Sequence, residues 1–316
     1  MTHIATIFDK NYLVRALALR NSLYRFAPKA TVWFLCLDNE AFELLKKLEL
    51  KNTNIINLEE VNDQELMSKR DSRTSVEFAM GSKASFLKYM LDSNKIHPGD
   101  GLVFIDADIL FYSDANKLFE KTVQNESIVL TAHKFSKEKE YLAPIRGYFN
   151  SGMIFFRNDE NARKCIEEWR KQCIEWCSLV YENGKHTDQL YLNAWPKKYK
   201  GVFELPNKGV NTGTWNIENF KITKKDGLFF VDEDVLICYH AHGLRIYVDG
   251  KMVRAYPITV FHSEIYDIYV KALQEAYEQI IKIRPDWNYG FVKKPDILRL
   301  TKQKILRYFR DLKNNI

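Results

Sequence analysis

The 316-residue sequence lacks the features that mark several common classes of protein. Its apolar runs all fall short of the roughly 18 residues that a membrane-spanning helix needs. The first residues, Met1-Thr2-His3, lead directly into a strand-like segment without the pattern of a signal peptide. We therefore expect the protein to stay in the cytoplasm.

Two glycine-rich patterns that hold phosphate groups are also missing. The chain contains neither G-x-G-x-x-G, the dinucleotide fingerprint, nor G-x-x-x-x-G-K-[ST], the phosphate-binding loop. Backbone amides of such a loop therefore cannot neutralise a diphosphate. A bound metal ion would have to do so.

Cysteine is scarce as well. The five residues are an odd number without paired metal-binding spacings, which favours a reducing compartment. Cys165, Cys173 and Cys177 share a face of one predicted helix. Since no histidine or second cysteine pair accompanies them, we expect buried thiols.

Hydrophobic residues make up 46% of the chain, enough for a large core in one domain or in one domain with an appendage. Strand-like and helix-like segments alternate from the N-terminus. Predicted strands cover residues 3–8, 31–37, 54–58, 102–111 and 127–132, and predicted helices cover residues 11–26, 42–50 and 82–91. The alternation predicts an α/β fold with a mostly parallel central sheet flanked by helices.

Three further segments are interpreted from their patterns. The polar residues 62–82 have no apolar period, which indicates a loop over the ligand site. Residues 159–180 form a predicted helix. Another helix opens at residues 186–189 and runs to Trp195, with Thr187 or Asp188 as a possible N-cap.

The predicted strand at residues 102–111 is an apolar run interrupted by Asp106 and Asp108. Side chains at i and i+2 of a strand point the same way, so both carboxylates can address one point beyond the strand's carboxyl end. Two carboxylates leave most of an octahedral shell open, which suits Mn²⁺ or Mg²⁺ shared with a diphosphate. The alternative is a pair of carboxylates that cap neighbouring backbone. The comparable triplet Asp232-Glu233-Asp234 has a third acid, and there we expect a solvated turn.

Other polar clusters stand where predicted elements meet. Asp9-Lys10-Asn11-Tyr12 follows the first strand, where it can hold a nucleotide or simply cap the next helix. Residues 147–156 are small and polar first and β-apolar afterwards, which predicts either a site loop around Asn150 or an ordinary turn before a strand. The buried-strand pattern at residues 235–243 ends in His240 and His242. His240 is either a metal ligand or a hydrogen-bonded structural residue.

Taken together, these motifs resemble the GT-A nucleotide-sugar glycosyltransferases, and most of all glycosyltransferase family 8 and its uncharacterised bacterial relatives. The motifs that carry the resemblance are, in chain order, Asp9-Lys10-Asn11-Tyr12 (nucleotide-binding first turn), Ser82-Lys83, Ile105-Asp106-Ala107-Asp108 (D-x-D), Gly147-Tyr148-Phe149-Asn150-Ser151-Gly152 (Y-[FY]-N-[AS]-G loop), Asp188-Gln189 (D-Q pair), Asn211 through Trp215-Asn216 (N-x-x-x-W-N) and His240 with Gly243 (H-x-x-G). The resemblance spans residues 3–250.

The resemblance implies a role for each residue. Donor-binding residues would be Ile7, Asp9, Asn11, Lys83, Asp106, Ala107, Asp108, Asn150, Ser151, Gly243 and Arg245. A Mn²⁺ or Mg²⁺ cofactor would be held by Asp106, Asp108 and His240. The catalytic residues would be Asp188 and Gln189, and the acceptor side would be formed by Asn211, Trp215 and Asn216. The family's H-x-x-G usually continues to a lysine on the diphosphate, for which Arg245 or Lys251 would substitute here.

The implied activity is transfer of a sugar from a nucleoside-diphosphate donor, a UDP-sugar, to a glycan or lipid-linked acceptor. The resemblance further implies retained anomeric configuration and a place in bacterial surface-polysaccharide synthesis. One alternative is a sugar-phosphate nucleotidyltransferase, whose G-x-G-T-R-L loop is missing. Another is a non-catalytic glycan-binding protein of the same fold, which the retained acidic pair, histidine and D-Q pair disfavour.

The C-terminus differs in charge from the rest of the chain. We expect a catalytic domain at residues 1–262 and a helical extension at residues 263–316. Residues 282–316 carry a net charge of +7 against +6 for the whole chain. From Asp296 onward, an apolar stripe lies among basic residues: Leu298, Ile305, Phe309 and Leu312. With Trp287, Tyr289 and Phe291 just upstream, the pattern predicts peripheral attachment to an anionic inner membrane face. The alternatives are a helix docked on the core and, lacking a motif, a nucleic-acid patch; we expect no nucleic-acid partner.

Overall fold

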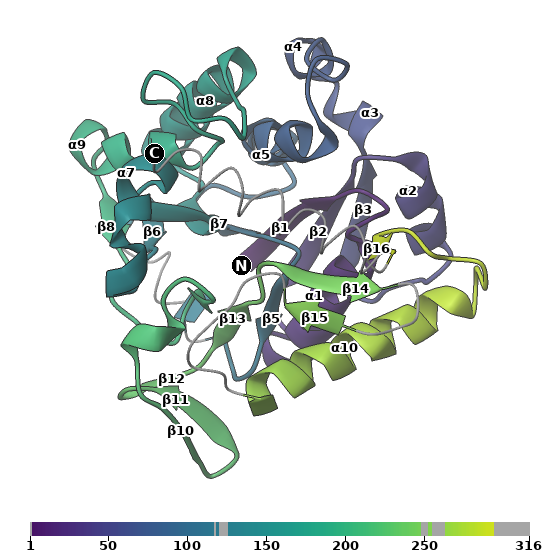
Figure 1. Cartoon of the computed structure of the whole chain (residues 1–316). Helices are drawn as coiled ribbons and strands as arrows, with labels where there is room; N and C mark the ends of the chain where they lie inside the picture. The colour runs from purple at the N-terminus through teal and green to yellow at the C-terminus, as the bar shows by residue number, and fades with distance from the viewer. Residues whose placement is uncertain (1, 117, 120–125, 248–251, 255–262, 294–316) are drawn as a thin grey trace, which may run out of the picture.

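The computed structural model describes residues 2–116, 118–119, 126–247, 252–254 and 263–293. Its centre is a seven-stranded sheet with helices on both faces (Figure 1). In spatial order the strands are β3 (Thr53–Asn57), β2 (Thr31–Cys36), β1 (Thr2–Phe8), β4 (Gly101–Ile105), β7 (Phe149–Arg157), β6 (Ile128–Ala132) and β8 (Val202–Glu204). Within this sheet only β7 runs against the others, between β4 and β6. The predicted α/β fold with a mostly parallel sheet is confirmed.

Helices cover the sheet because its strands are apolar on both sides. In β1, Ile4 belongs to one buried cluster with α1 and α10, whereas Ala5 belongs to a second cluster with α5 and α8. The described α-helices are α1 (Leu13–Phe26), α2 (Asn39–Lys46), α3 (Leu58–Val61), α4 (Gln64–Met67), α5 (Ser75–Asp92), α7 (Ala143–Arg146), α8 (Glu160–Glu175), α9 (Trp195–Lys198) and α10 (Ser263–Ile281). Short 3-10 helices are η1 (Lys137–Leu142), η2 (Leu190–Ala194) and η3 (Ile217–Asn219).

Three small sheets flank the central one. The first has the strand order β10 (Ile222–Lys225), β11 (Leu228–Val231), β12 (Asp234–Val235). The second is β5 (Ile109–Phe111), β13 (Cys238–His240), β9 (Thr212–Gly213). The third is β15 (Met252–Arg254), β14 (Leu244–Tyr247), β16 (Phe291–Val292).

The prediction of one long strand at residues 102–111 is wrong. The chain leaves the central sheet after Ile105 and joins a different sheet at Ile109, where β5 pairs with β13. Both parts are fully buried, so their apolar runs merge in the sequence. The same division separates β12 from β13 within residues 235–243. Asp106 and Asp108 therefore lie in or beside a tight turn between two sheets, not on one extended strand.

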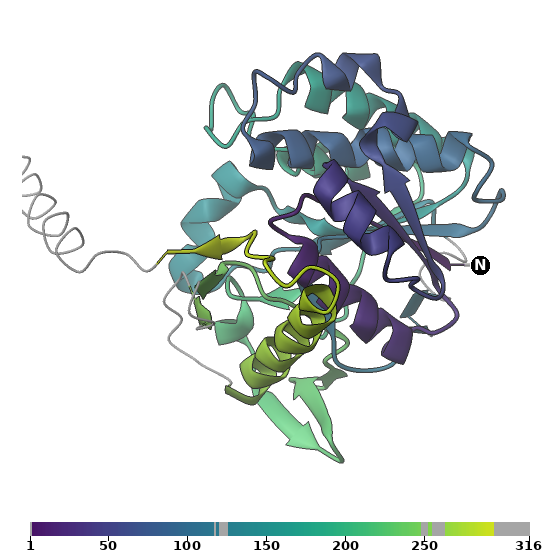
Figure 2. The same ribbon diagram turned by 90° about the vertical axis from the view of Figure 1, so that its right-hand side faces the viewer.

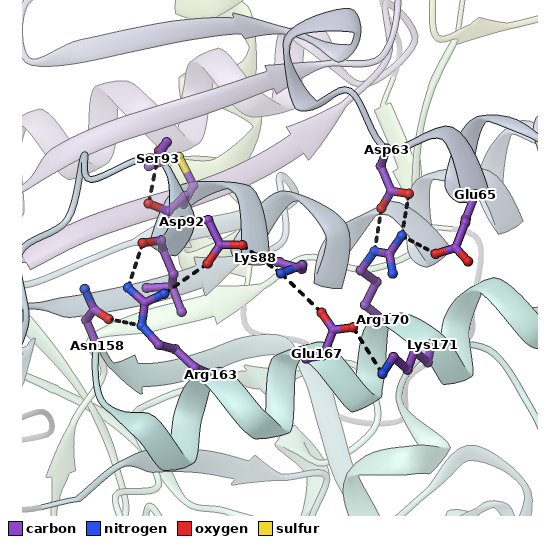
Figure 3. A network of polar contacts seen from close by, with 12 residues as sticks. Asp63, Glu65, Lys88, Asp92, Ser93, Asn158, Arg163, Glu167, Arg170 and Lys171 are labelled. Carbon is purple, nitrogen blue, oxygen red and sulfur yellow. Dashed lines mark hydrogen bonds and ion pairs between the residues drawn. The ribbon is translucent and has the colours of Figure 1, made fainter.

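The prediction of a loop at residues 62–82 is also wrong. This segment contains α4 and the first turns of α5, which begins at Ser75. The helix α5 begins at Ser75, where Thr74 and Glu77 form a capping box. Figure 3 shows that Arg170 of α8 binds the segment around α4. Its guanidinium donates to both Asp63 carboxylate oxygens at 2.6 Å and to Glu65 at 2.6 Å. A short polar helix held by ion pairs has no apolar period to reveal it.

Two helix predictions need new limits. The helix expected to reach Val180 ends at Glu175, and Trp176 is already extended. The helix expected at residues 186–195 consists of η2 followed by α9. Gln189 is the residue before η2 and makes no side-chain capping bond, so neither Thr187 nor Asp188 is the N-cap.

The helix α10 lies along α1, as Figure 2 shows for the yellow and purple helices. Its Tyr269, Leu273 and Ile280 are buried in the same cluster as α1. The predicted boundary at residue 262 falls directly before α10 and stays a prediction, as does the amphipathic stripe from Asp296 onward, which lies outside the described residues. Among the helices that the structure describes, none is long and apolar enough to cross a membrane.

Candidate donor and metal site

Most of the predicted site residues meet at one edge of the central sheet. Asp9 follows β1 and Asp106 follows β4, so both stand at carboxyl ends of parallel strands. Because β7 is antiparallel, its beginning reaches the same edge, and Gly152 accepts a bond from the Asp106 amide at 2.8 Å. Asn150 and Ser151 lie within β7, beside a register shift in its pairing with β6. The predicted site loop is therefore the start of a strand.

Lys83 of α5 joins two of the acidic residues. Its ammonium lies 3.0 Å from Asp106 Oδ1 and 3.1 Å from Asp188 Oδ2, and it donates to Ser151 Oγ at 3.2 Å. The lysine is only 4% exposed. Although burial opposes this, Asp106 and Asp188 raise the pKa of Lys83 above its ordinary value, so the ammonium keeps its charge. A buried cation thus links the D-x-D motif to the D-Q pair.

Asp108 faces His240, the last residue of β13, and His242, two residues further along the chain. Asp108 Oδ1 lies 3.0 Å from His240 Nε2, and Asp108 Oδ2 lies 4.0 Å from His242 Nδ1. One ligand atom from each of the three residues fits within 4.8 Å, which makes them a possible metal-binding group. His242 was not among the predicted ligands. Its only sequence signal is the i, i+2 spacing from His240.

Asp106 and His240 both lie against Gly152 of β7. A Cβ atom added to Gly152 would lie 2.5 Å from His240 Cε1 and 2.9 Å from Asp106 Oδ2. Only glycine leaves room for the imidazole and the carboxylate to come this close to β7. Asp106 is close to His240 at this glycine but is outside the group of Asp108, His240 and His242 whose ligand atoms lie within 4.8 Å, so its role as a metal ligand stays a prediction.

The electrostatics of this cluster favour a cation. Burial raises the pKa of Asp106 even with Lys83 beside it. Burial also opposes the ionised forms of Asp108 and His240, but their contact lowers the pKa of the aspartate and raises that of the histidine. Asp108 and Asp188 are buried and the Asp106 side chain is 29% exposed; these three carboxylates lie beside Lys83 and His240. With His240 neutral, as a metal ligand is, three formal negative charges face one ammonium, and a divalent ion would balance the other two.

The donor set also fits a six-coordinate ion. Adjacent ligands of an octahedral ion with bonds of about 2.1 Å lie about 3 Å apart. The separation between Asp108 Oδ1 and His240 Nε2 is 3.0 Å. Two carboxylates with one imidazole suit Mn²⁺ better than Mg²⁺, which prefers oxygen alone.

The D-Q pair lies across Lys83 from the D-x-D motif. Asp188 is buried, and its backbone oxygen accepts a bond from Trp169 Nε1 at 2.8 Å. Gln189 is half-buried; its Nε2 donates to the Arg146 oxygen at 2.7 Å and its Oε1 accepts from the Ser151 amide at 3.4 Å. Both residues therefore border the start of β7.

A family model described as glycosyl transferase family 8 matches residues 3–208. The chain belongs to glycosyltransferase family 8. It is 28% identical over 298 residues to the uncharacterized protein YfnD of Bacillus subtilis (strain 168), covering 92% of this chain and 95% of YfnD. It is 29% identical over 300 residues to the uncharacterized protein YfnF of the same organism, covering 92% and 97% of the two chains.

The fold is similar to that of the galactosyltransferase LgtC, whose crystal structure was solved in complex with donor and acceptor sugar analogs. The TM-score is 0.56 at 14% identity, over 88% of this chain and 99% of LgtC. Such a distant likeness shows the shared GT-A fold. Family membership makes this protein a glycosyltransferase that uses a nucleotide-sugar donor.

Two asparagines predicted on the acceptor side of this family 8 enzyme bind neighbouring protein groups. Asn211 is 1% exposed, and its Oδ1 lies 3.1 Å from His240 Nδ1. Asn216 is also buried; it donates to the His133 oxygen at 2.8 Å and accepts from the Gly213 amide at 2.9 Å. Their assignment to the acceptor side stays a prediction.

Trp215, the third predicted acceptor-side residue, packs edge-to-face on His240 with 5.0 Å between ring centroids. It is 9% exposed and also contacts His133. Its indole therefore supports the imidazoles that surround the candidate metal site. Sequence analysis missed His133, since a single histidine after a strand carries no motif.

The residues predicted to hold the nucleotide line two neighbouring segments. Ile7 is buried in β1, and Asp9 accepts bonds from Asn11 through the backbone amide at 3.0 Å and through Nδ2 at 2.9 Å. Gly243 and the exposed Arg245 lie at the start of β14. Ala107 is buried between the two aspartates.

The comparison triplet is different. Asp232 and Glu233 bind the Lys208 ammonium at 3.1 Å and 3.0 Å, and Asp234 accepts from the Lys208 amide at 2.7 Å. The structure confirms a turn at the surface, where one lysine pairs with the acids.

Proposed function

We propose that the protein transfers a sugar from a UDP-sugar to a glycan or lipid-linked acceptor, with a divalent cation and with retention of anomeric configuration. The observation that carries the proposal is a pair of ionic contacts at the sheet edge, in which Lys83 joins Asp106 to Asp188 and His240 lies against Asp108. A structural role alone would not require so many buried ionisable groups at one point.

Asp106, Asp108 and His240 would hold Mn²⁺ or Mg²⁺. The bound ion supplies charge stabilisation for the departing diphosphate. Lys83 fixes the orientation of Asp106 and Asp188 through its two ion pairs. Gly152 supports the same arrangement, since its missing side chain admits the imidazole.

The donor would lie between the first turn and β14. Ile7, Asp9 and Asn11 would bind the nucleoside from one side, and Gly243 and Arg245 the diphosphate from the other. Arg245 is exposed and follows Gly243 by two residues, so it is our candidate for the family's missing lysine. Ala107, Asn150 and Ser151 would border the donor sugar. Trp215 is proposed to limit the site on the histidine side.

Asp188 and Gln189 would lie beside the anomeric carbon. The ion pair to Lys83 holds Asp188 in place, and the Arg146 oxygen orients the Gln189 amide. We favour same-face transfer, in which the leaving phosphate accepts the acceptor's proton. Proton NMR coupling constants of the product report the configuration, and an inverted product would contradict retention.

Calorimetry of UDP binding tests the metal requirement. We expect binding with Mn²⁺ and none with EDTA, because no glycine-rich loop is present to neutralise the diphosphate. Asp108→Asn should abolish the Mn²⁺-dependent binding. The matched control Asp234→Asn removes an acid from the comparison triplet and should bind like the wild type. Equal UDP affinity with and without EDTA would exclude the metal role of Asp106 and Asp108.

Release of nucleoside diphosphate across a panel of sugar nucleotides with Mn²⁺ identifies the donor. A lipid-linked acceptor of surface-polysaccharide synthesis is our proposal for the second substrate, because the basic C-terminus would bring the site to a membrane.

A further inference from the structure

The residues after α10 return to the catalytic domain. We name residues 284–293 the C-terminal strap. Trp287 is 1% exposed and belongs to the core cluster of α1 and α10. Its backbone oxygen accepts a bond from the Tyr277 hydroxyl at 3.1 Å, and the Tyr277 ring contacts Phe291. The strap is therefore fixed on α10, and Trp287 is not available to a membrane as the sequence pattern had suggested.

From this anchor the strap reaches the turn that follows β1. The Gly290 amide donates to Asn11 Oδ1 at 3.2 Å, and the Lys10 ammonium lies 4.5 Å from the Tyr289 ring centroid. Gly290 has a φ of +78°, and a Cβ atom there would lie 1.9 Å from the Asn11 oxygen. Backbone thus packs directly on backbone, an approach that only glycine permits.

The strap also pairs with the segment that follows Gly243. In β16, Phe291 and Val292 run parallel to Ile246 and Tyr247 of β14. Figure 1 shows the yellow β16 next to the green β14. One short segment therefore contacts both walls of the proposed nucleotide site. The second connection between these walls is Arg15, which donates to the Leu244 oxygen at 2.8 Å.

We propose that the C-terminal strap is a positioning element of the nucleotide site, which sets the spacing between the Asp9–Asn11 turn and β14. This inference rests on the proposed function. The Asn11 amide is oriented from both ends, because its Oδ1 accepts from Gly290 and its Nδ2 donates to Asp9. The strap lies beyond residues 3–208, which the family model matches.

The test compares Gly290→Ala with Gly227→Ala. Gly227 has nearly the same φ, +80°, but has nothing within 4 Å of the added Cβ atom. Both glycines have a positive φ, so an alanine at either position strains the backbone and should lower the melting temperature by a similar amount. The clash with the Asn11 oxygen adds a further loss in Gly290→Ala. Only Gly290→Ala should weaken UDP binding in the presence of Mn²⁺, by at least about tenfold in the dissociation constant.

A second pair of variants avoids the backbone. Tyr289→Ala removes the ring that contacts Lys10 and should weaken UDP binding in the same direction, whereas Tyr289→Phe keeps the ring and should restore wild-type affinity. If Gly290→Ala and Tyr289→Ala bind UDP as the wild type does, the strap has no positioning role. Tighter binding by either variant would also overturn the proposal, since the strap would then obstruct the site. If the wild-type protein does not bind UDP in the presence of Mn²⁺, the proposed function itself is contradicted.

Discussion

Asn211 determines which nitrogen of His240 faces Asp108. The Asn211 amide nitrogen lies 2.9 Å from Thr131 Oγ1 and 3.1 Å from Asn150 Oδ1. The Thr131 hydroxyl donates to the Met153 oxygen, and Asn150 Oδ1 already accepts from the Gly152 amide. Both are acceptors toward Asn211, so its oxygen must point at His240 Nδ1.

The same logic continues on the far side of Asn150. Its Nδ2 donates to His133 Nε2 at 3.1 Å, and His133 Nδ1 donates to the Gly147 oxygen at 2.9 Å. Burial lowers the pKa of His133 to about 3, so this imidazole stays neutral and accepts through Nε2. The donors and acceptors in this series of hydrogen bonds, from His133 through Asn150 and Asn211 to His240, are thus fixed by the backbone groups that they contact. His240 therefore carries its proton on Nδ1 when neutral and presents Nε2 to Asp108, the state a metal ligand requires.

We predict that Asn211→Gly lowers Mn²⁺ affinity by about tenfold, because the amide that orients His240 is lost. Glycine keeps the left-handed backbone of this residue, whose φ is +58°. Electron paramagnetic resonance of free Mn²⁺ measures the affinity without nucleotide or turnover. Nitrogen-15 NMR at a pH where His240 is neutral should show the proton moving from Nδ1 to Nε2.

The control for this experiment is Asn183→Gly, an exposed asparagine with a φ of +51°. It removes the same side chain from the same backbone conformation. Asn183 lies on the surface and far in sequence from the proposed metal ligands. Unchanged Mn²⁺ affinity and an unchanged His240 tautomer in Asn211→Gly would show that the amide is only a packing group.

At the scale of elements, hydrophobic patterns predicted which segments are buried strands but not which sheet each strand joins. The strands β1, β2, β3 and β6 were found within one residue or two, since each is a separate apolar run. The run at residues 102–111 hid a change of sheet, because β4 and β5 are equally buried. Asp106 and Asp108 still lie at the edge where β4 ends, and their role in the site stays a prediction.

The capping box of α5 was visible in the sequence as Thr74 and Glu77, but the helix was placed too late. Polar residues before an apolar segment look like a loop when the first turns of a helix are only partly buried. The N-x-x-x-W-N motif drew attention to Asn211, but its contact with His240 could not have been predicted. The orientation of its amide depends on Asn150, 61 residues away in the chain.

Glu77 makes the stability of α5 dependent on pH. Although burial opposes it, hydrogen bonds from the Leu179 amide, the Ser178 hydroxyl and Thr74 lower its pKa from 4.5 to about 2. Since the folded-state pKa is below the unfolded value, the stabilisation is complete above pH 4.5 and is lost as the pH falls toward about 2. Glu77→Gln keeps a capping partner without the charge, so we expect a lower free energy of unfolding by about 1 kcal/mol at pH 7.

Urea denaturation of both proteins at several pH values measures this. The difference between wild type and Glu77→Gln should shrink steadily below pH 4.5. Glu182→Gln, at an exposed position, should match the wild type throughout. A difference that stays constant with pH would mean that the charge of Glu77 contributes nothing.

At the scale of the whole molecule, the catalytic face and the basic C-terminus are joined through the strap. Trp287 is in the core, and Tyr289 and Phe291 contact Lys10 and Tyr277. These aromatics are therefore engaged by the enzyme itself. Any membrane attachment must depend on residues 294–316, which hold seven Lys or Arg and two Asp.

We predict that truncation after Lys293 abolishes binding to anionic vesicles and leaves UDP binding intact. Each Lys or Arg near an anionic leaflet contributes about 1 kcal/mol, so full-length protein should bind phosphatidylglycerol vesicles at low salt and dissociate as salt rises. The cut spares the strap, so the melting temperature and the UDP dissociation constant should stay at wild-type values. Cosedimentation with vesicles of phosphatidylglycerol and with vesicles of phosphatidylcholine separates charge from general adhesion. Full-length protein that ignores both at low salt, or a truncated chain that melts many degrees lower, would instead indicate that residues 294–316 dock on the enzyme's own core.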